Sequence, residues 1–140
     1  MFRRKALLFG ISNLIGFFSF FMPWIQDLSY NLSGYAIIQM GLRFNWGFSW
    51  LLGLLPFAFL LSAVLKFIPS NFLNKTIKKS IDAIPILLIL TIAICLFISA
   101  DNFSIPSNFF DHFLRSVRLG LYLTIATSVI CLFSPASIFN

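Results

Sequence analysis

The sequence predicts an all-α integral membrane protein, built as an antiparallel bundle of four transmembrane helices with both termini in the cytoplasm. Composition is the first observation, because hydrophobic residues make up 59% of the 140 residues and charged residues only 10%. A soluble domain has roughly a quarter of its residues charged, so a water-exposed globular fold and a nucleic-acid module are excluded. The apolar segments and the positions of the basic residues are the other two observations.

Four apolar segments have the length that a membrane helix needs, which is about 20 residues. The fourth is the weakest because Arg118 lies in its first turn, but a long basic side chain can reach the membrane interface. Pro56 falls inside the second segment, where we expect a kink. The segments form one domain over residues 1–140 and comprise Ala6–Trp24, Trp46–Phe67, Ala83–Ala100 and Val117–Phe133.

The basic residues predict the orientation. Seven of the ten Lys and Arg residues lie before the first segment, at the end of the second or in the connection to the third, and the other three lie on the opposite side. Because Lys and Arg are enriched in cytoplasmic loops, we expect this protein in the bacterial inner (plasma) membrane with its termini inside. Residues expected to contact lipid at the two interfaces are Lys75, Lys78, Lys79, Trp24, Trp46 and Trp50.

The first outer loop, Ile25–Asn45, is unusually apolar. Its period-two pattern on both sides of Ser33-Gly34 favours a short β-hairpin, while a short helix begun by Ser33 is the competing interpretation. An apolar loop with an unpaired strand edge invites another chain to pair with it. We therefore expect a partner to dock at Tyr30, Tyr35 and Arg43.

The chemistry that the sequence lacks points away from an enzyme. There is no Glu, His112 is the only histidine, and Cys95 and Cys131 lie on different segments. These residues supply no metal cluster, no vicinal thiol pair and no catalytic triad. We expect no catalytic, cofactor-binding or metal-binding residues.

Small and hydroxyl side chains recur along each predicted helix, as they do where membrane helices pack together. Asn13 is the one side chain whose burial in lipid would clearly be unfavourable, so it is expected to face another helix. The predicted helix-packing residues are Ser12, Asn13, Gly16, Ala58, Ser62, Thr91, Cys95, Ser99, Gly120, Thr124 and Ser128.

Pro23-Trp24 followed by Leu32-Ser33-Gly34-Tyr35 resembles a loose group of small four-helix bacterial membrane proteins. The order of features is also similar to the claudin architecture, although the G-L-W motif and the loop cysteine pair of claudins are missing. The claudin resemblance implies a scaffold that self-associates through its first outer loop.

These observations predict a non-catalytic accessory or structural subunit of a larger membrane protein complex. Its partners would be membrane lipids and other integral membrane subunits, with a homo-oligomer as a further form and no nucleic acid. Two alternatives stay open. One is a transport or lipid-handling component with a site between its helices, and the other is the claudin-like scaffold.

Overall fold

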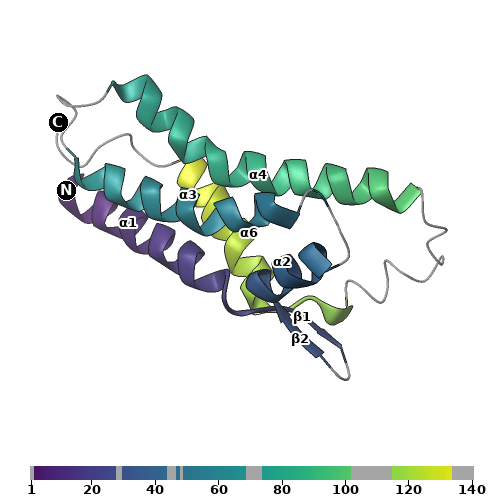
Figure 1. Ribbon diagram of the computed structural model, residues 1–140. Coiled ribbons are helices and arrows are strands. Elements are labelled where there is room, and N and C mark those ends of the chain that lie inside the picture. Colours follow the sequence, from purple (N-terminus) through teal and green to yellow (C-terminus); the bar gives the residue numbers. More distant parts are fainter. Residues whose placement is uncertain are drawn as a thin grey trace.

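A computed structural model describes residues 2–27, 30–43, 47, 49–68, 74–101 and 115–133 of the chain. In this part the chain is mostly helical, with five helices and one two-stranded sheet (Figure 1). In chain order the elements are α1 (Phe2–Ser19), β1 (Pro23–Asp27), β2 (Tyr30–Ser33), α2 (Gly34–Arg43), α3 (Ser49–Phe67), α4 (Lys75–Asp101) and α6 (Leu119–Leu132).

The four longer helices form a closed ring of contacts. α1 packs against α3 and α6, and α4 packs against the same two helices. The hairpin and α2 lie at one end of this ring, where α2 contacts α3 and β1 contacts α6 (Figure 1). The buried hydrophobic core between these elements consists of Phe20, Trp24, Leu52, Leu55, Phe59 and Ile92.

The prediction of four membrane-spanning helices is wrong. Within the described residues, only α3 is long and apolar enough to cross a membrane. A helix rises about 1.5 Å per residue and the hydrocarbon core is about 30 Å thick. The apolar part of α1, Leu7–Ser19, and the 14 residues of α6 are therefore too short. α4 has 27 residues, but its N-terminal turns are rich in charge.

Local structure explains why α1 and α6 are shorter than predicted. α1 ends at Ser19 because the chain turns and enters β1 at Pro23, whose nitrogen has no hydrogen to donate to a helix. The segment before α6 is held extended by the hairpin. Val117 forms a β-bridge with Ile25, and the backbone nitrogen of Arg118 donates to the carbonyl of Trp24 at 2.8 Å. Both predicted spans thus lose residues to the β-structure.

α4 begins at Lys75, ahead of the predicted start of the third span at Ala83. The side chain of Asn74 caps it by accepting a hydrogen bond from the backbone nitrogen of Thr76 at 3.2 Å. The segment that contains Lys75, Lys78 and Lys79 is therefore the first part of a long helix. Pro85, the third residue of the predicted third span, lies buried inside α4.

The hairpin differs in position from the predicted one. β1 and β2 pair antiparallel, from Pro23 opposite Ser33 to Asp27 opposite Tyr30, with an irregularity between Pro23 and Ile25. Trp24 lies at this irregularity and is buried, with its ring edge-to-face with Phe20 at 5.6 Å between centroids. Its indole nitrogen donates to the carbonyl of Ser19 at 3.0 Å. The irregularity thereby directs the tryptophan into the core.

A helix follows β2 where the alternating pattern suggested a second strand. The hydroxyl of Ser33 accepts a hydrogen bond from the backbone nitrogen of Ala36 at 3.2 Å, as an N-cap does. The competing interpretation, a helix begun by Ser33, therefore describes this part of the loop. Gly34 donates its backbone nitrogen to the carbonyl of Phe20, and a Cβ there would lie 2.6 Å from the Phe20 ring.

The contact between α6 and β1 generates a first prediction. A Cβ added at Gly120 would lie 2.6 Å from the carbonyl oxygen of Pro23, a backbone atom in a paired strand that has little freedom to move. We expect Gly120→Ala to lower the free energy of unfolding by about 1–3 kcal/mol, the usual effect of overpacking. Chemical denaturation followed by circular dichroism measures this change.

Gly53→Ala is the matched control, because Gly53 also lies in a helix. A Cβ there would make an ordinary contact, 3.6 Å from Ile38, and alanine is favoured over glycine in helices by about 1 kcal/mol. Its stability should be unchanged or higher. Equal losses for the two variants would contradict the close approach of α6 to β1.

Candidate functional site

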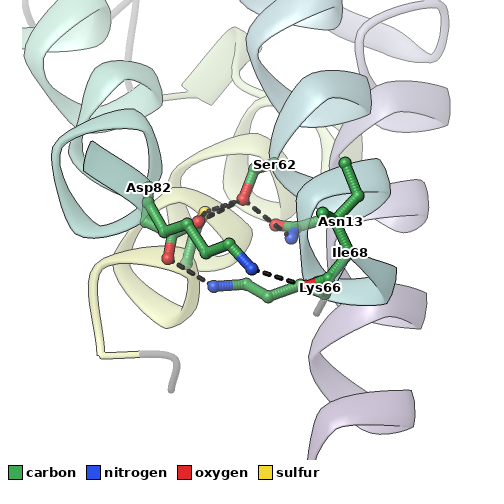
Figure 2. Close-up of polar contacts among 7 residues, drawn as sticks. Asn13, Ser62, Lys66, Ile68 and Asp82 are labelled. Carbon is green, nitrogen blue, oxygen red and sulfur yellow. Dashed lines mark hydrogen bonds and ion pairs between the residues drawn. The ribbon is translucent and has the colours of Figure 1, made fainter. Parts of the chain in front are cut away.

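Polar side chains gather inside the molecule where the four longer helices meet. α1 supplies Asn13, α3 supplies Ser62 and Lys66, α4 supplies Asp82 and α6 supplies Cys131 (Figure 2). All five are buried, with at most 2% of each residue exposed. We call this group the polar cluster.

The centre of the polar cluster is an ion pair between α3 and α4. The ammonium group of Lys66 donates to one carboxylate oxygen of Asp82 (Figure 2). Removing two charges from water is expensive, and the attraction between them compensates only when both are also well hydrogen-bonded. The surrounding residues meet this condition for Asp82.

The hydroxyl group of Ser62 on α3 contacts a residue from each of the other three longer helices. It donates to the second carboxylate oxygen of Asp82 at 2.5 Å and accepts a hydrogen bond from the amide nitrogen of Asn13 at 3.1 Å. The sulfur of Cys131 lies 3.2 Å from the Ser62 oxygen and 3.9 Å from Asp82. Both carboxylate oxygens of Asp82 therefore accept hydrogen bonds from α3, and Cys131 adds a longer contact from α6.

Lys78 lies one turn before Asp82 on α4 and also points inward. Its ammonium group donates to the carbonyl oxygen of Ile68, just after the end of α3 (Figure 2). Burial, followed by the positive charge of Lys66, lowers the pKa of Lys78, and the carboxylate of Asp82 opposes this shift. This contact ties the start of α4 to the end of α3.

A second polar contact lies further along α1 and α6. The hydroxyl oxygens of Ser19 and Thr124 are 2.7 Å apart, and each is also within 2.8 Å of a backbone carbonyl oxygen of its own helix. Gly16 lets α1 come close at this level, since a Cβ there would lie 2.7 Å from the ring of Phe59 and 2.8 Å from Thr127. Small and hydroxyl residues thus hold α1 near both of its neighbours.

The groups of the polar cluster suit it to fixing the positions of the helices along one another. Its acid and its central base neutralise each other, and within the described residues no group of His, Cys, Asp and Glu could hold a metal ion. Cys95 and Cys131 are both free thiols. His112 lies outside the described residues.

The predicted helix-packing residues fall into four groups. Ser12 and Cys95 are half-buried, while Thr91 is exposed and its hydroxyl donates to the carbonyl of Leu87 in its own helix. The side chain of Ser99 lies outside the described residues. The structure buries Asn13, Gly16, Ala58, Ser62, Gly120, Thr124 and Ser128.

Some of the residues predicted to contact lipid or a partner are exposed, and others are buried. Lys78 and Trp24 are buried, which contradicts the prediction that they contact lipid. Lys75, Lys79 and Trp50 are exposed. Trp46 lies outside the described residues. Among the expected docking residues, Tyr35 and Arg43 are exposed on α2; Tyr30 lies in β2, and its side chain is outside the described part.

Sequence reasoning missed the role of Lys66, Lys78 and Asp82, because each was counted as a charge at the cytoplasmic face. A signal for them was available in the spacing. Lys66 follows Ser62 by four residues and Asp82 follows Lys78 by four, so each pair shares a helix face. A basic residue on the same face as a packing serine indicates an inward position.

In comparisons with known proteins, no family model matches this chain, and neither a curated protein nor a solved structure matches it. The resemblance to claudins therefore stays an expectation drawn from short motifs. The function is therefore inferred from the geometry of the described residues.

The polar cluster generates a second prediction. Asp82→Asn leaves the Lys66 charge buried without its counter-charge, so the free energy of unfolding should fall by about 3–5 kcal/mol. Replacing both charges, by Lys66→Met with Asp82→Leu, should have a smaller effect because the buried Lys66 charge is removed together with its counter-charge, and Lys78 keeps its hydrogen bond to the carbonyl of Ile68. Thermal and chemical unfolding in one mild detergent compares the variants.

Lys79→Gln is the control, since Lys79 is an exposed lysine on the same helix. Its stability should stay within about 0.5 kcal/mol of the wild type. A small effect of Asp82→Asn, or a double variant as unstable as the single one, would contradict the central position of the ion pair.

Proposed function

We propose that this chain is a non-catalytic accessory subunit of a membrane protein complex, whose apolar outer surface contacts lipid acyl chains and the helices of other subunits. The supporting observation is the distribution of side chains. Polar and charged residues are buried between the helices, while large apolar residues face outward. In a water-exposed fold Leu, Ile and Phe are the residues most often buried, and Lys and Asp among those least often buried.

The outward apolar residues form continuous faces along the helices. On α1 they follow the spacing of one helix face, from Leu7 through Ile11 and Leu14 to Phe18. On α3, Phe57 is 68% exposed, and on α6, Leu119 is 63% exposed. Soluble monomers rarely expose contiguous apolar patches larger than a few hundred Å², so these faces favour an apolar environment.

The short lengths of α1 and α6 favour a protein partner in addition to lipid. A backbone that leaves its helix within the hydrocarbon region must be buried in protein, because lipid offers no hydrogen bonds. α1 and α6 touch each other, and α1 also packs on α3. We infer that α3 enters the membrane and that helices of another subunit cover the shorter apolar helices beside it.

α2 is the element we assign to partner docking. Tyr35, Leu42 and Arg43 are exposed on this helix, at the same end of the molecule as the hairpin. The phenol oxygen of Tyr35 accepts a hydrogen bond from the side chain of Gln39 at 2.9 Å, which holds the ring on the helix surface. Exposed tyrosine and arginine side chains are typical of the residues that dominate binding at protein interfaces.

The test is affinity purification in mild detergent followed by native mass spectrometry. The wild-type chain should retain one or more foreign membrane polypeptides. Tyr35→Ala with Arg43→Ala should reduce their recovery at least ten-fold, which corresponds to about 1.4 kcal/mol and is modest for two interface anchors. Asn31→Ala, an exposed polar change in the neighbouring strand, should leave recovery unchanged.

Other results would contradict the proposal. Recovery of self-copies alone would favour the self-associating scaffold. Recovery of lipid alone would favour a lipid-handling component. Full recovery of partners by the Tyr35 and Arg43 variant would place the docking surface away from α2.

A further inference from the structure

A basic recess lies on the surface of the first turns of α4. Its lining consists of Lys75, Thr76, Lys79, Ser80 and Ala83, and the open space over these side chains has a volume of about 560 Å³. Lys75 and Lys79 are exposed and one helical turn apart, so their ammonium groups can reach the same ligand. The recess therefore combines two cations with two hydroxyl groups.

The positive charge of the recess is not neutralised from within α4. The first acid along this helix, Asp82, is buried and pairs with Lys66 on α3. Lys78 lies between the two exposed lysines in sequence but points inward to the carbonyl of Ile68. The helix thus separates its lysines, with one in the core and two available to an external anion.

An apolar stripe continues from the recess along the same face of α4. From Lys79 and Ala83 the spacing leads to Leu87, Leu90 and Ile94, which are 56%, 52% and 58% exposed. At about 1.5 Å per residue, the distance from Lys79 to Ile94 is about 22 Å, more than half of a hydrocarbon core about 30 Å thick. The stripe is long enough to accompany an acyl chain through one leaflet.

We propose that this face of α4 binds an anionic phospholipid, with the phosphate between Lys75 and Lys79 and one acyl chain along the Leu87–Ile94 stripe. The inference rests on the proposed membrane association of the chain. The two ammonium groups and the hydroxyl of Thr76 can hold a phosphate group, whereas the hydroxyl of Ser80 already donates to the carbonyl of Thr76 at 3.0 Å. A free phosphate would leave the stripe uncovered. A phospholipid satisfies both parts of the surface at once.

The experiment reconstitutes the full chain in bilayer discs of equimolar phosphatidylcholine and phosphatidylglycerol. Native mass spectrometry then counts the lipids that remain bound. The wild type should retain phosphatidylglycerol in preference to phosphatidylcholine. Lys75→Gln with Lys79→Gln should lower this preference about 25-fold, since one lysine near an anionic leaflet contributes about a five-fold change in binding.

Arg115→Gln with Arg118→Gln is the matched control. It removes the same net charge from two other exposed positions and should keep the preference for phosphatidylglycerol. All four positions are exposed, so the circular dichroism of both variants should match that of the wild type. An equal loss of preference in both variants would overturn the inference, because the effect would then be one of overall charge.

The stripe is tested separately from the recess. Leu87→Gln with Leu90→Gln should reduce the retention of phosphatidylglycerol while both lysines remain, and excess inorganic phosphate should not displace the lipid from the wild type. If the stripe variant keeps the lipid and phosphate displaces it, the recess is a site for free phosphate and the lipid assignment is wrong.

The two proposals fail in different ways. A chain that incorporates into the discs but retains both lipids equally would overturn the phospholipid site alone. A chain that does not enter discs of either lipid would overturn the membrane association and, with it, the site that depends on that association.

Discussion

The buried ion pair between Lys66 and Asp82 is the interaction on which the arrangement of the helices depends. It joins α3 to α4, and Ser62 extends it to Asn13 on α1 and to Cys131 on α6. Neither charge is satisfied unless the helices keep their positions along each other, because a shift by one turn would separate the groups. In a molecule whose apolar side chains point both inward and outward, burial of hydrophobic surface alone would select this register weakly. Polar groups that must find each other select it strongly.

The rest of the structure is consistent with polar groups buried between the helices and large apolar side chains on the outer surface. Glycine and hydroxyl residues let α1 approach α3 and α6, while the hairpin closes one end of the ring by placing Trp24 against Phe20. The same hairpin limits the length of α1 and holds the chain extended before α6. The outward faces of the helices are left apolar, and among the described side chains the exposed lysines lie at the start of α4. Polar groups buried between the helices and an apolar exterior both favour function at a membrane and in contact with other chains.

Sequence reasoning located the helical segments better than their ends or their environment. Composition and periodicity indicate where apolar helices lie, but the limits of α1 and α6 depend on β-pairing between Ile25 and Val117, residues distant in sequence. Among the described residues, one helix is both long and apolar enough to cross a membrane, since β-structure shortens two of the predicted spans and the first turns of α4 are charged. Charge counting placed Lys66, Lys78 and Asp82 at the cytoplasmic face, because the partner of a buried charge cannot be read from composition. Asn13 was easier to interpret, since an amide on an apolar helix requires a polar partner, and the structure places Ser62 opposite it.

A spin label on α3 shows whether the apolar exterior of the protein is shielded from water. The label is attached to a cysteine that replaces Phe57, in a chain with Cys95 replaced by alanine and Cys131 left buried. After reconstitution in bilayers, its collision rates with oxygen and with a water-soluble nickel complex are compared with those of a label at the exposed Gln39 on α2. If lipid covers the apolar face of α3, collisions with oxygen are frequent and those with nickel few at position 57, and the reverse holds at position 39. Equal access of nickel to both positions would show that the apolar face of α3 lies in water, and it would contradict the account.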